Sequence, residues 1–268
     1  MKHLKAPEGA IRLATYHELD QFLEAFAGGH INLLILLGGP GLAKSQSVRH
    51  KLGMRAAWVE GNATAHGLYT KAYHSRDQPI VIDDVDSLYS DRAAVRLLKC
   101  LAQTDLVKRM AWHSASLSLQ SEGIPREFET RSRSIIIANE WRTLSENVAA
   151  VQDRGHVLLF EPTPEELHAR VGEWFTDPEI YEWFGRRLAL IEKPSMRHYV
   201  RAQELKSAGL DWETMIGGQF MPPKLLLVAR LREDKGFASE AERVEEFRRL
   251  GGGSRATYFN HAKRLRAA

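Results

Sequence analysis

The fold is decided by residues 31–46, which read INLLILLGGPGLAKSQ. The first seven residues, 31–37, are apolar apart from Asn32 and have the length of a buried strand. A glycine-rich loop follows at once, and it ends in Lys44-Ser45, where a helix is expected to begin. This order of strand, loop and Lys-Ser matches the phosphate-binding loop (P-loop) pattern, except that Ala43 replaces its last glycine.

The glycine-rich loop predicts a site for ATP and Mg²⁺. Its glycines allow backbone N–H groups to face phosphate, and the N-terminus of the following helix adds positive potential. We expect Lys44 to reach the outer phosphates and Ser45 to bind the metal. If Ala43 needs a positive φ, its side chain costs about 1 kcal/mol. The alternative is a turn between strand and helix that binds no ligand. The predicted nucleotide-binding residues are Gly38, Gly39, Pro40, Gly41, Leu42, Ala43, Lys44, Ser45 and Gln46.

A second apolar run ends in acidic residues. Residues 80–84 read IVIDD, and a buried strand that ends in carboxylates presents them at the carboxyl edge of a sheet. We expect Asp83 to hold Mg²⁺ together with Ser45, and Asp84 to orient the attacking water. Because many strands end in aspartate, this prediction depends on the glycine-rich loop lying nearby.

Strands and helices alternate through the first part of the chain, which predicts an α/β fold with a parallel sheet covered by helices. The expected strands are 31–37, 57–59, 80–83, 110–113, 134–138 and 157–160, and the expected helices are 16–28, one from about 44, and 91–103. After Pro162 and Pro164 only helical segments follow. We therefore expect a nucleotide-binding core over 1–161, a small helical lid over 162–220 and a helical domain over 221–268.

Composition is that of an ordinary globular protein. Of 268 residues, 44% are hydrophobic and 26% charged, and no apolar run reaches the length of about 20 residues that a membrane helix needs. The single cysteine, Cys100, cannot form an internal disulfide, which favours a reducing cytoplasm. The net charge is +3.

Four segments, taken in order, resemble the AAA+ ATPases, with features of the ATPases of mobile elements and phages. The resemblance covers roughly residues 15–215. The glycine-rich loop resembles Walker A, and the acidic strand end resembles Walker B. Residues 134–139 (SIIIAN) resemble the sensor 1 strand, which implies that Asn139 positions water beside the terminal phosphate. The family also implies assembly into oligomers.

The same resemblance points to two arginines. Residues 152–157 (QDRGHV) resemble the segment before the last core strand, which makes Arg154 a candidate arginine finger for a neighbouring subunit. Arg197 follows Pro194-Ser195 at a helix start and is placed like a sensor 2 arginine. Arg131 and Arg133, which flank the sensor 1 strand, compete for the finger role.

Some features also resemble superfamily 3 helicases. Asp84 stands where AAA+ ATPases usually have glutamate, and paired acids at this point are common in those helicases. The strand ending in Asn139 and residues 124–128 (IPREF) are similar to them too. Residues 114–130 are expected to form a hairpin that projects from the core. A helicase therefore remains an alternative.

The C-terminal segment is basic and contains no acidic residue after Arg248. Residues 254–265 resemble the recognition helix of helix-turn-helix proteins, and a polyanion such as DNA suits their charge. The residues expected to face DNA are Arg255, Tyr258, His261, Lys263 and Arg264, with Arg266 also on phosphate, while Ala256, Phe259 and Leu265 are expected to pack inward. The alternative is a helical hairpin that packs on the core or mediates assembly.

Together these features predict an oligomeric ATPase that binds MgATP and loads on, remodels or moves along DNA, or serves a mobile element. Two alternatives stay open. One is a nucleotide-gated DNA-binding switch or assembly factor with little hydrolysis. The other is a superfamily 3-like helicase.

Overall fold

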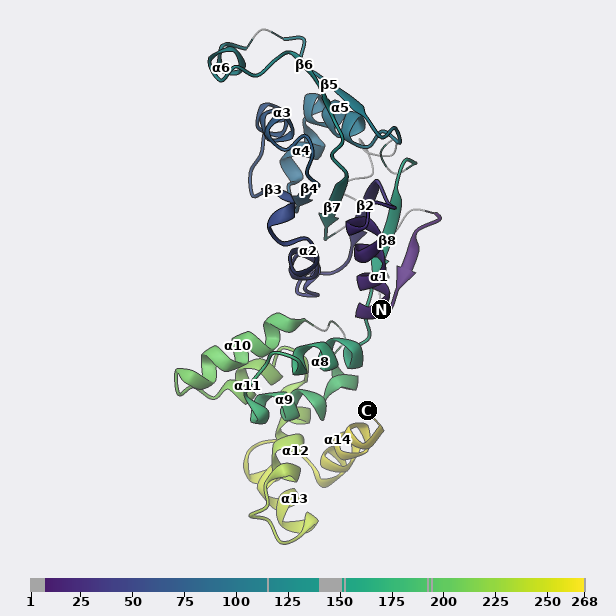
Figure 1. Cartoon of the computed structure of the whole chain (residues 1–268). Helices are drawn as coiled ribbons and strands as arrows, with labels where there is room; N and C mark the ends of the chain where they lie inside the picture. Colours follow the sequence, from purple (N-terminus) through teal and green to yellow (C-terminus); the bar gives the residue numbers. More distant parts are fainter. Residues whose placement is uncertain are drawn as a thin grey trace. The chain divides into compact units, whose positions relative to one another are not determined.

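The computed structural model describes residues 8–114, 116–139, 151, 153–191, 193 and 195–267. The chain divides into two compact units, Met1–Thr163 and Pro164–Ala268. The first unit contains all strands among the described residues, and the second contains only helices (Figure 1). The predicted further division at residue 220 stays a prediction.

The first unit is built on a parallel sheet, as predicted, and this sheet has six strands. Its strand order is β1-β8-β2-β7-β4-β3. The strands are β1 (Ile11–Leu13), β2 (Leu33–Leu37), β3 (Ala57–Glu60), β4 (Ile80–Asp83), β7 (Ser134–Ala138) and β8 (His156–Phe160). All five residues of β2 are buried. Leu37 at its end lies level with Ala138 of β7 and Leu159 of β8. The carboxyl ends of the central strands therefore meet at one edge.

Helices cover this sheet in the first unit. They are α1 (Tyr16–Ala27), α2 (Lys44–Leu52), α3 (Ala65–His74), α4 (Asp86–Ser90) and α5 (Arg92–Leu101), with the short 3₁₀ helix η1 (Gly53–Arg55) after α2. The alternate residues Leu33, Ile35 and Leu37 of β2 share one core with buried residues of α3, α4 and α5. The predicted helix 91–103 is confirmed in its main part, and Asp91 caps it by accepting from the Ala93 N–H at 2.8 Å.

Residues 110–113 were expected to form a strand of the main sheet, and this is wrong. Instead, β5 (Lys108–Ala111) pairs antiparallel with β6 (Glu127–Thr130) in a separate two-stranded ribbon. The short helix α6 (Leu117–Ser121) lies between them, at the end of the ribbon away from the parallel sheet (Figure 1). The expected hairpin therefore exists but begins earlier in the chain.

A buried lysine fixes the base of this ribbon. The Lys108 side chain is only 1% exposed. Its ammonium donates to Leu101 O at 2.7 Å, Ser132 O at 2.7 Å and Asn32 Oδ1 at 2.8 Å. Burial, helped by the charge of Arg133, lowers the pKa of Lys108 to about 8. One side chain thus joins the ribbon to the end of α5 and to the segments before β2 and β7.

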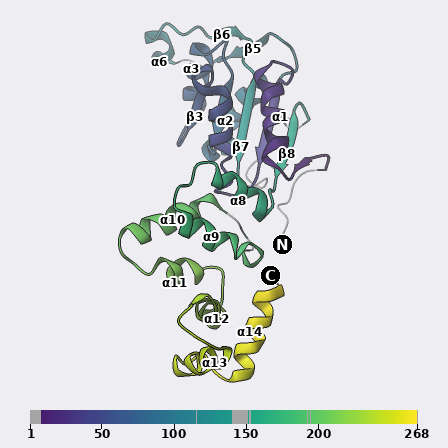
Figure 2. The same ribbon diagram turned by 60° about the horizontal axis from the view of Figure 1, so that its bottom comes forward.

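The second unit is helical, as predicted. It consists of α8 (Pro164–Gly172), α9 (Pro178–Gly185), η2 (Leu188–Leu190), α10 (Met196–Ser207), α11 (Trp212–Gly217), α12 (Pro223–Glu233), α13 (Glu240–Arg249) and α14 (Arg255–Ala267). The last three pack together, with α14 beside α12 and α13 (Figure 2). None of the described helices combines the length and apolar character that a bilayer span requires.

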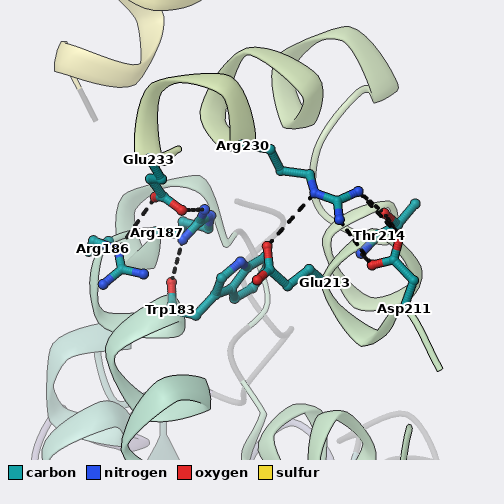
Figure 3. Close-up of polar contacts among 8 residues, drawn as sticks. All are labelled: Trp183, Arg186, Arg187, Asp211, Glu213, Thr214, Arg230 and Glu233. Carbon is teal, nitrogen blue, oxygen red and sulfur yellow. Dashed lines mark hydrogen bonds and ion pairs between the residues drawn. The ribbon is translucent and has the colours of Figure 1, made fainter. Parts of the chain in front are cut away.

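Polar contacts connect α12 to α9 and α11 (Figure 3). The buried Arg187 donates to Trp183 O at 3.0 Å and to Glu233 Oε2 at 2.7 Å. Arg230 spans to the start of α11, where it lies 3.3 Å from Asp211 Oδ2 and donates to Thr214 Oγ1 at 2.5 Å. These contacts run between residues on both sides of the predicted 220 boundary.

Candidate phosphate-binding site and basic C-terminal face

The glycine-rich loop lies between β2 and α2, at the carboxyl edge of the sheet. Gly38 is buried, and a Cβ there would lie 2.6 Å from Phe160 O, so only glycine allows β8 to approach so closely. Ala43 has φ 56 and ψ 23, the left-handed conformation. Ala43 therefore has the positive φ that was expected to strain it.

Lys44 points back into its own loop. Its ammonium donates to Gly38 O at 2.7 Å, Gly39 O at 2.8 Å and Asn139 Oδ1 at 3.1 Å. The side chain is only 6% exposed. Lys44 therefore joins the end of β2 to the end of β7, so that a positive charge stands where the glycine-rich loop opens.

Ser45 and Asp83 are in contact, although they come from different elements. The Ser45 hydroxyl at the start of α2 lies close enough to the Asp83 carboxylate at the end of β4 to affect its pKa. Burial raises the pKa of Asp83 above its ordinary value of 3.8, and the neighbouring Ser45 hydroxyl works against that rise. A hydroxyl and one carboxylate are oxygen ligands of the kind that Mg²⁺ uses alongside water and phosphate. The donor set therefore fits this metal.

Asp84 sits beside this pair in an unusual backbone conformation. Its φ is 54, and its N–H donates to Ile137 O of β7 at 3.0 Å. The Asn139 amide donates to Asp84 Oδ2 at 2.8 Å. Since Asn139 also accepts from Lys44, it connects the cation of the loop to the acid of the neighbouring strand. The predicted catalytic residues Asp84 and Asn139 thus lie together with Lys44.

Two residues that the sequence did not single out belong to this edge. Glu60 ends β3 directly opposite Asp83, and its charge raises the pKa of Asp83 further. Arg49 of α2 forms an ion pair with Glu60 and stacks 3.8 Å above the ring centre of Trp58. The signal for Glu60 was available, because it also ends an apolar strand. Nothing in the sequence pattern pointed to Arg49.

Within the first unit, the predicted arginine Arg154 lies apart from this cluster. Arg154 is exposed and precedes β8, whose first residue His156 pairs with Leu34. It is therefore at the edge opposite the glycine-rich loop, where it donates to Lys99 O at 2.9 Å. Arg197 belongs to the second unit and is exposed in the first turn of α10. Gln152 and Pro194, from the same sequence segments, lie outside the described residues.

The competing arginines have structural partners. Arg133 donates to Phe26 O and lies 5.3 Å from the ring centre of Phe26. Arg131 lies 4.0 Å from Asp77 at the surface.

In α14, the exposed face differs from the face that was predicted to contact DNA. Tyr258 is fully buried and forms a core with Val228, Leu231, Val244, Phe247 and Ala262. Its assignment as a DNA contact is therefore wrong. Phe259, expected inside, is 39% exposed, and Ala256 is exposed too. The reason is helical phase, because residues 258, 262 and 265 share one side of α14 and leave 256, 259, 260 and 263 on the other.

The turn before α14 fixes this phase. Gly252 lies against the Phe247 ring, where a Cβ would come within 2.3 Å of ring carbon. Phe247 in turn contacts Tyr258 edge to face, with 5.5 Å between ring centres. Ser254 then caps α14 by accepting from the Thr257 N–H at 3.2 Å. Of the predicted contacts, Arg255, Lys263 and Arg264 are exposed and His261 is half-buried.

Comparison with known proteins supports the fold. No protein-family model matches the chain. Over 133 residues it is 27% identical to an uncharacterized 36.7 kDa protein from the nrdC–mobD intergenic region of Enterobacteria phage T4, a match covering 46% of this chain and 41% of the phage protein. The chain thus aligns with less than half of that relative.

Two solved structures resemble the whole chain. Cdc6p from Pyrobaculum aerophilum matches at 12% identity with a TM-score of 0.53, over 98% of this chain and 88% of that structure. NtrX from Brucella abortus, solved in complex with ATP, matches at 14% identity with a TM-score of 0.48, over 97% of this chain and 69% of that one. The chain has the fold of the AAA+ P-loop NTPases, with a helical C-terminal region, as predicted.

Proposed function

We propose that this protein is an AAA+ ATPase that binds MgATP at the glycine-rich loop, assembles into oligomers and acts on DNA. The observation that supports this most directly is the convergence of Lys44, Ser45 and Asp83 at the carboxyl edge of one sheet. A nucleotide with Mg²⁺ needs a cation beside its phosphates, and it needs a hydroxyl and a carboxylate beside the metal. Lys44, Ser45 and Asp83 are side chains of these three kinds.

Each residue of the cluster has a role in this proposal. Lys44 would exchange its bonds to the loop carbonyls for bonds to the outer phosphates. Ser45 and Asp83 would hold Mg²⁺, which neutralises phosphate charge when bound. Asp84 would orient the attacking water, and Asn139 would hold both Asp84 and that water. Arg154 of a neighbouring subunit would stabilise the charge of the transferring phosphoryl group, and Arg197 would contact the nucleotide from the helical unit.

Binding and turnover of MgATP test the nucleotide half of the proposal. Lys44→Ala should abolish ATP binding, whereas Asp84→Asn should keep binding and lose turnover. Asparagine tolerates the left-handed backbone of residue 84, so this variant separates chemistry from folding. Because Lys44 is buried, its variant must first melt like the parent protein. Unchanged ATP affinity in a folded Lys44→Ala protein would contradict the proposed site.

DNA binding is supported by unpaired charge on α14. On α13 each of Arg243, Arg248 and Arg249 pairs with the glutamate three residues before it. Among the described residues, none of Arg255, Lys263, Arg264 and Arg266 forms an ion pair with a carboxylate. A helix with such a face favours a polyanion partner.

Charge reversal is the better test of this face, because deleting residues 247–268 would remove Phe247 and Tyr258 from the core. Lys263→Glu with Arg264→Glu should weaken binding to duplex DNA strongly and reduce its dependence on salt. Glu245→Lys on α13 is a control outside the face. Equal DNA affinity in the double variant would show that the face is structural.

A nucleotide-gated switch remains the second candidate, and one observation favours it. The water-orienting position holds Asp84 rather than the longer glutamate, on a left-handed backbone. Tight ATP binding without DNA-stimulated turnover would support this reading. Directional strand displacement would instead support the helicase.

A further inference from the structure

The exposed side of α14 carries two kinds of residue. Arg255 and Lys263 lie at its ends, and Ala256, Phe259 and Asn260 lie between them. These positions follow a spacing of one, four, five and eight residues from Arg255, so they form one continuous stripe. The opposite side packs on α12 and α13 through Tyr258 and Ala262. The stripe therefore has a cationic residue at each end and a small group of apolar and amide side chains between them.

The apolar centre is held open to solvent. Phe259 is 39% exposed, and the Arg255 guanidinium lies 5.4 Å from its ring centre. This contact keeps the ring on the outer side of the first two turns of the helix. Asn260, the next residue, is exposed as well.

These side chains match the edge of one kind of base pair. In the major groove an asparagine forms two hydrogen bonds with adenine N6 and N7, and a phenylalanine or alanine contacts the thymine methyl group. Arginine and lysine at the borders of such a helix suit the phosphates on either side. The N-terminal residues of a groove-bound helix are those that reach base edges, and 255–260 occupy that end of α14.

We infer that α14 reads A·T base pairs in the major groove of duplex DNA, with Asn260 on adenine and Phe259 on the thymine methyl group. This rests on the proposed DNA binding and adds sequence preference to it. Asn260 and Phe259 specify the base pair, while Arg255 and Lys263 provide affinity without specificity.

Modified duplexes test each contact separately. The full-length protein should bind an alternating A·T duplex about tenfold or more tightly than an alternating G·C duplex at equal salt. Replacing thymine with uracil, which removes the methyl group, should weaken binding to the parent protein but not to Phe259→Ala. Replacing adenine with 7-deazaadenine should weaken binding to the parent but not to Asn260→Ala. Both variants should keep the salt dependence of the parent, since phosphate contacts remain.

Trp174→Ala is the matched control, because Trp174 is a 47% exposed aromatic residue elsewhere in the same unit. It should leave every duplex preference unchanged. Equal affinity of the parent for A·T and G·C duplexes, or indifference to the thymine methyl group, would overturn the inference while leaving DNA binding intact. Tighter binding to the single strands than to the duplex would also overturn it. If no duplex binds even with MgATP, the proposed action on DNA fails as well.

Discussion

At the scale of single residues, the candidate site depends on two backbone positions that L-amino acids rarely occupy. Ala43 and Asp84 both have positive φ, at 56 and 54. They flank the same edge, one before Lys44 and the other after Asp83. For Ala43 the left-handed conformation places Cβ close to the following carbonyl oxygen, which costs about 1–2 kcal/mol, whereas aspartate adopts this conformation more readily. The protein maintains this strain where phosphate and water are expected to bind.

The strain at Ala43 gives a first prediction. Ala43→Gly should raise the free energy of unfolding by about 1 kcal/mol, because glycine adopts the left-handed conformation without steric cost. Urea unfolding without nucleotide measures the change. Ala93→Gly, in the helical first turn of α5, is the control and should destabilise the protein instead. A loss of stability in Ala43→Gly would show that the methyl group packs favourably.

Residue-level patterns also mark the limit of what the sequence could predict. Lys44, Ser45 and Asp83 were identified because phosphate and metal chemistry fixes both their type and their spacing. The positions predicted for Tyr258 and Phe259 were the reverse of those observed, with Tyr258 expected outside and Phe259 inside. The reason is that α14 has apolar residues on more than one side, so composition does not define its buried face. Only the packing of Tyr258 on Phe247 decides it.

At the scale of elements, the long apolar strands were predictable and the short or polar ones were not. Buried strands such as β2 and β7 are continuous apolar runs, as a parallel sheet requires. The edge strand β1 has three residues, too few to show a period. The strand β5 was misplaced because its anchor is Lys108, and a charged residue does not predict burial.

The Lys108 anchor gives a second prediction. Lys108→Met should destabilise the protein by about 3 kcal/mol, because three buried acceptors would lose their donor. The folded pKa of about 8 lies below the ordinary 10.5, so the unfolded chain binds more protons between these values. The stability that Lys108 contributes is therefore complete above pH 10.5 and decreases as the pH falls to about 8.

Chemical unfolding across this alkaline range measures the effect. The stability of the parent protein should rise with pH relative to Lys108→Met. Lys71→Met, at an exposed position of α3, should change the stability little, because surface substitutions usually stay within about 0.5 kcal/mol. A constant difference between the parent and Lys108→Met at all pH values would mean that Lys108 titrates normally in the fold.

At the scale of the whole molecule, the main question is whether one chain contains a complete site. Lys44, Ser45, Asp83, Asp84 and Asn139 come together within the first unit, but Arg154 lies at the other edge of its sheet. It cannot complete the site of its own chain from there without unfolding β8. An arginine in that place suits a neighbour, as the resemblance to AAA+ ATPases implies.

A mixing experiment tests this third prediction. Arg154→Ala should bind ATP normally but lose about 10³-fold in turnover. Lys44→Ala should lose ATP binding and should therefore be inactive as well. Mixing the two inactive proteins should restore part of the activity, because some interfaces then pair an intact loop with an intact arginine. Arg131→Ala is the control arginine and should remain active alone. Failure of the mixture to regain activity would contradict a role for Arg154 across subunits.

The left-handed backbone at Asp84 also sets a constraint on redesign. Installing a glutamate there is the obvious way to seek a faster hydrolase, yet a longer side chain tolerates this conformation less well than aspartate or asparagine. Such an exchange would have to be accompanied by a new path for the chain after β4, without the bond from residue 84 to Ile137. The short acid and the turn that carries it must therefore be engineered as one unit.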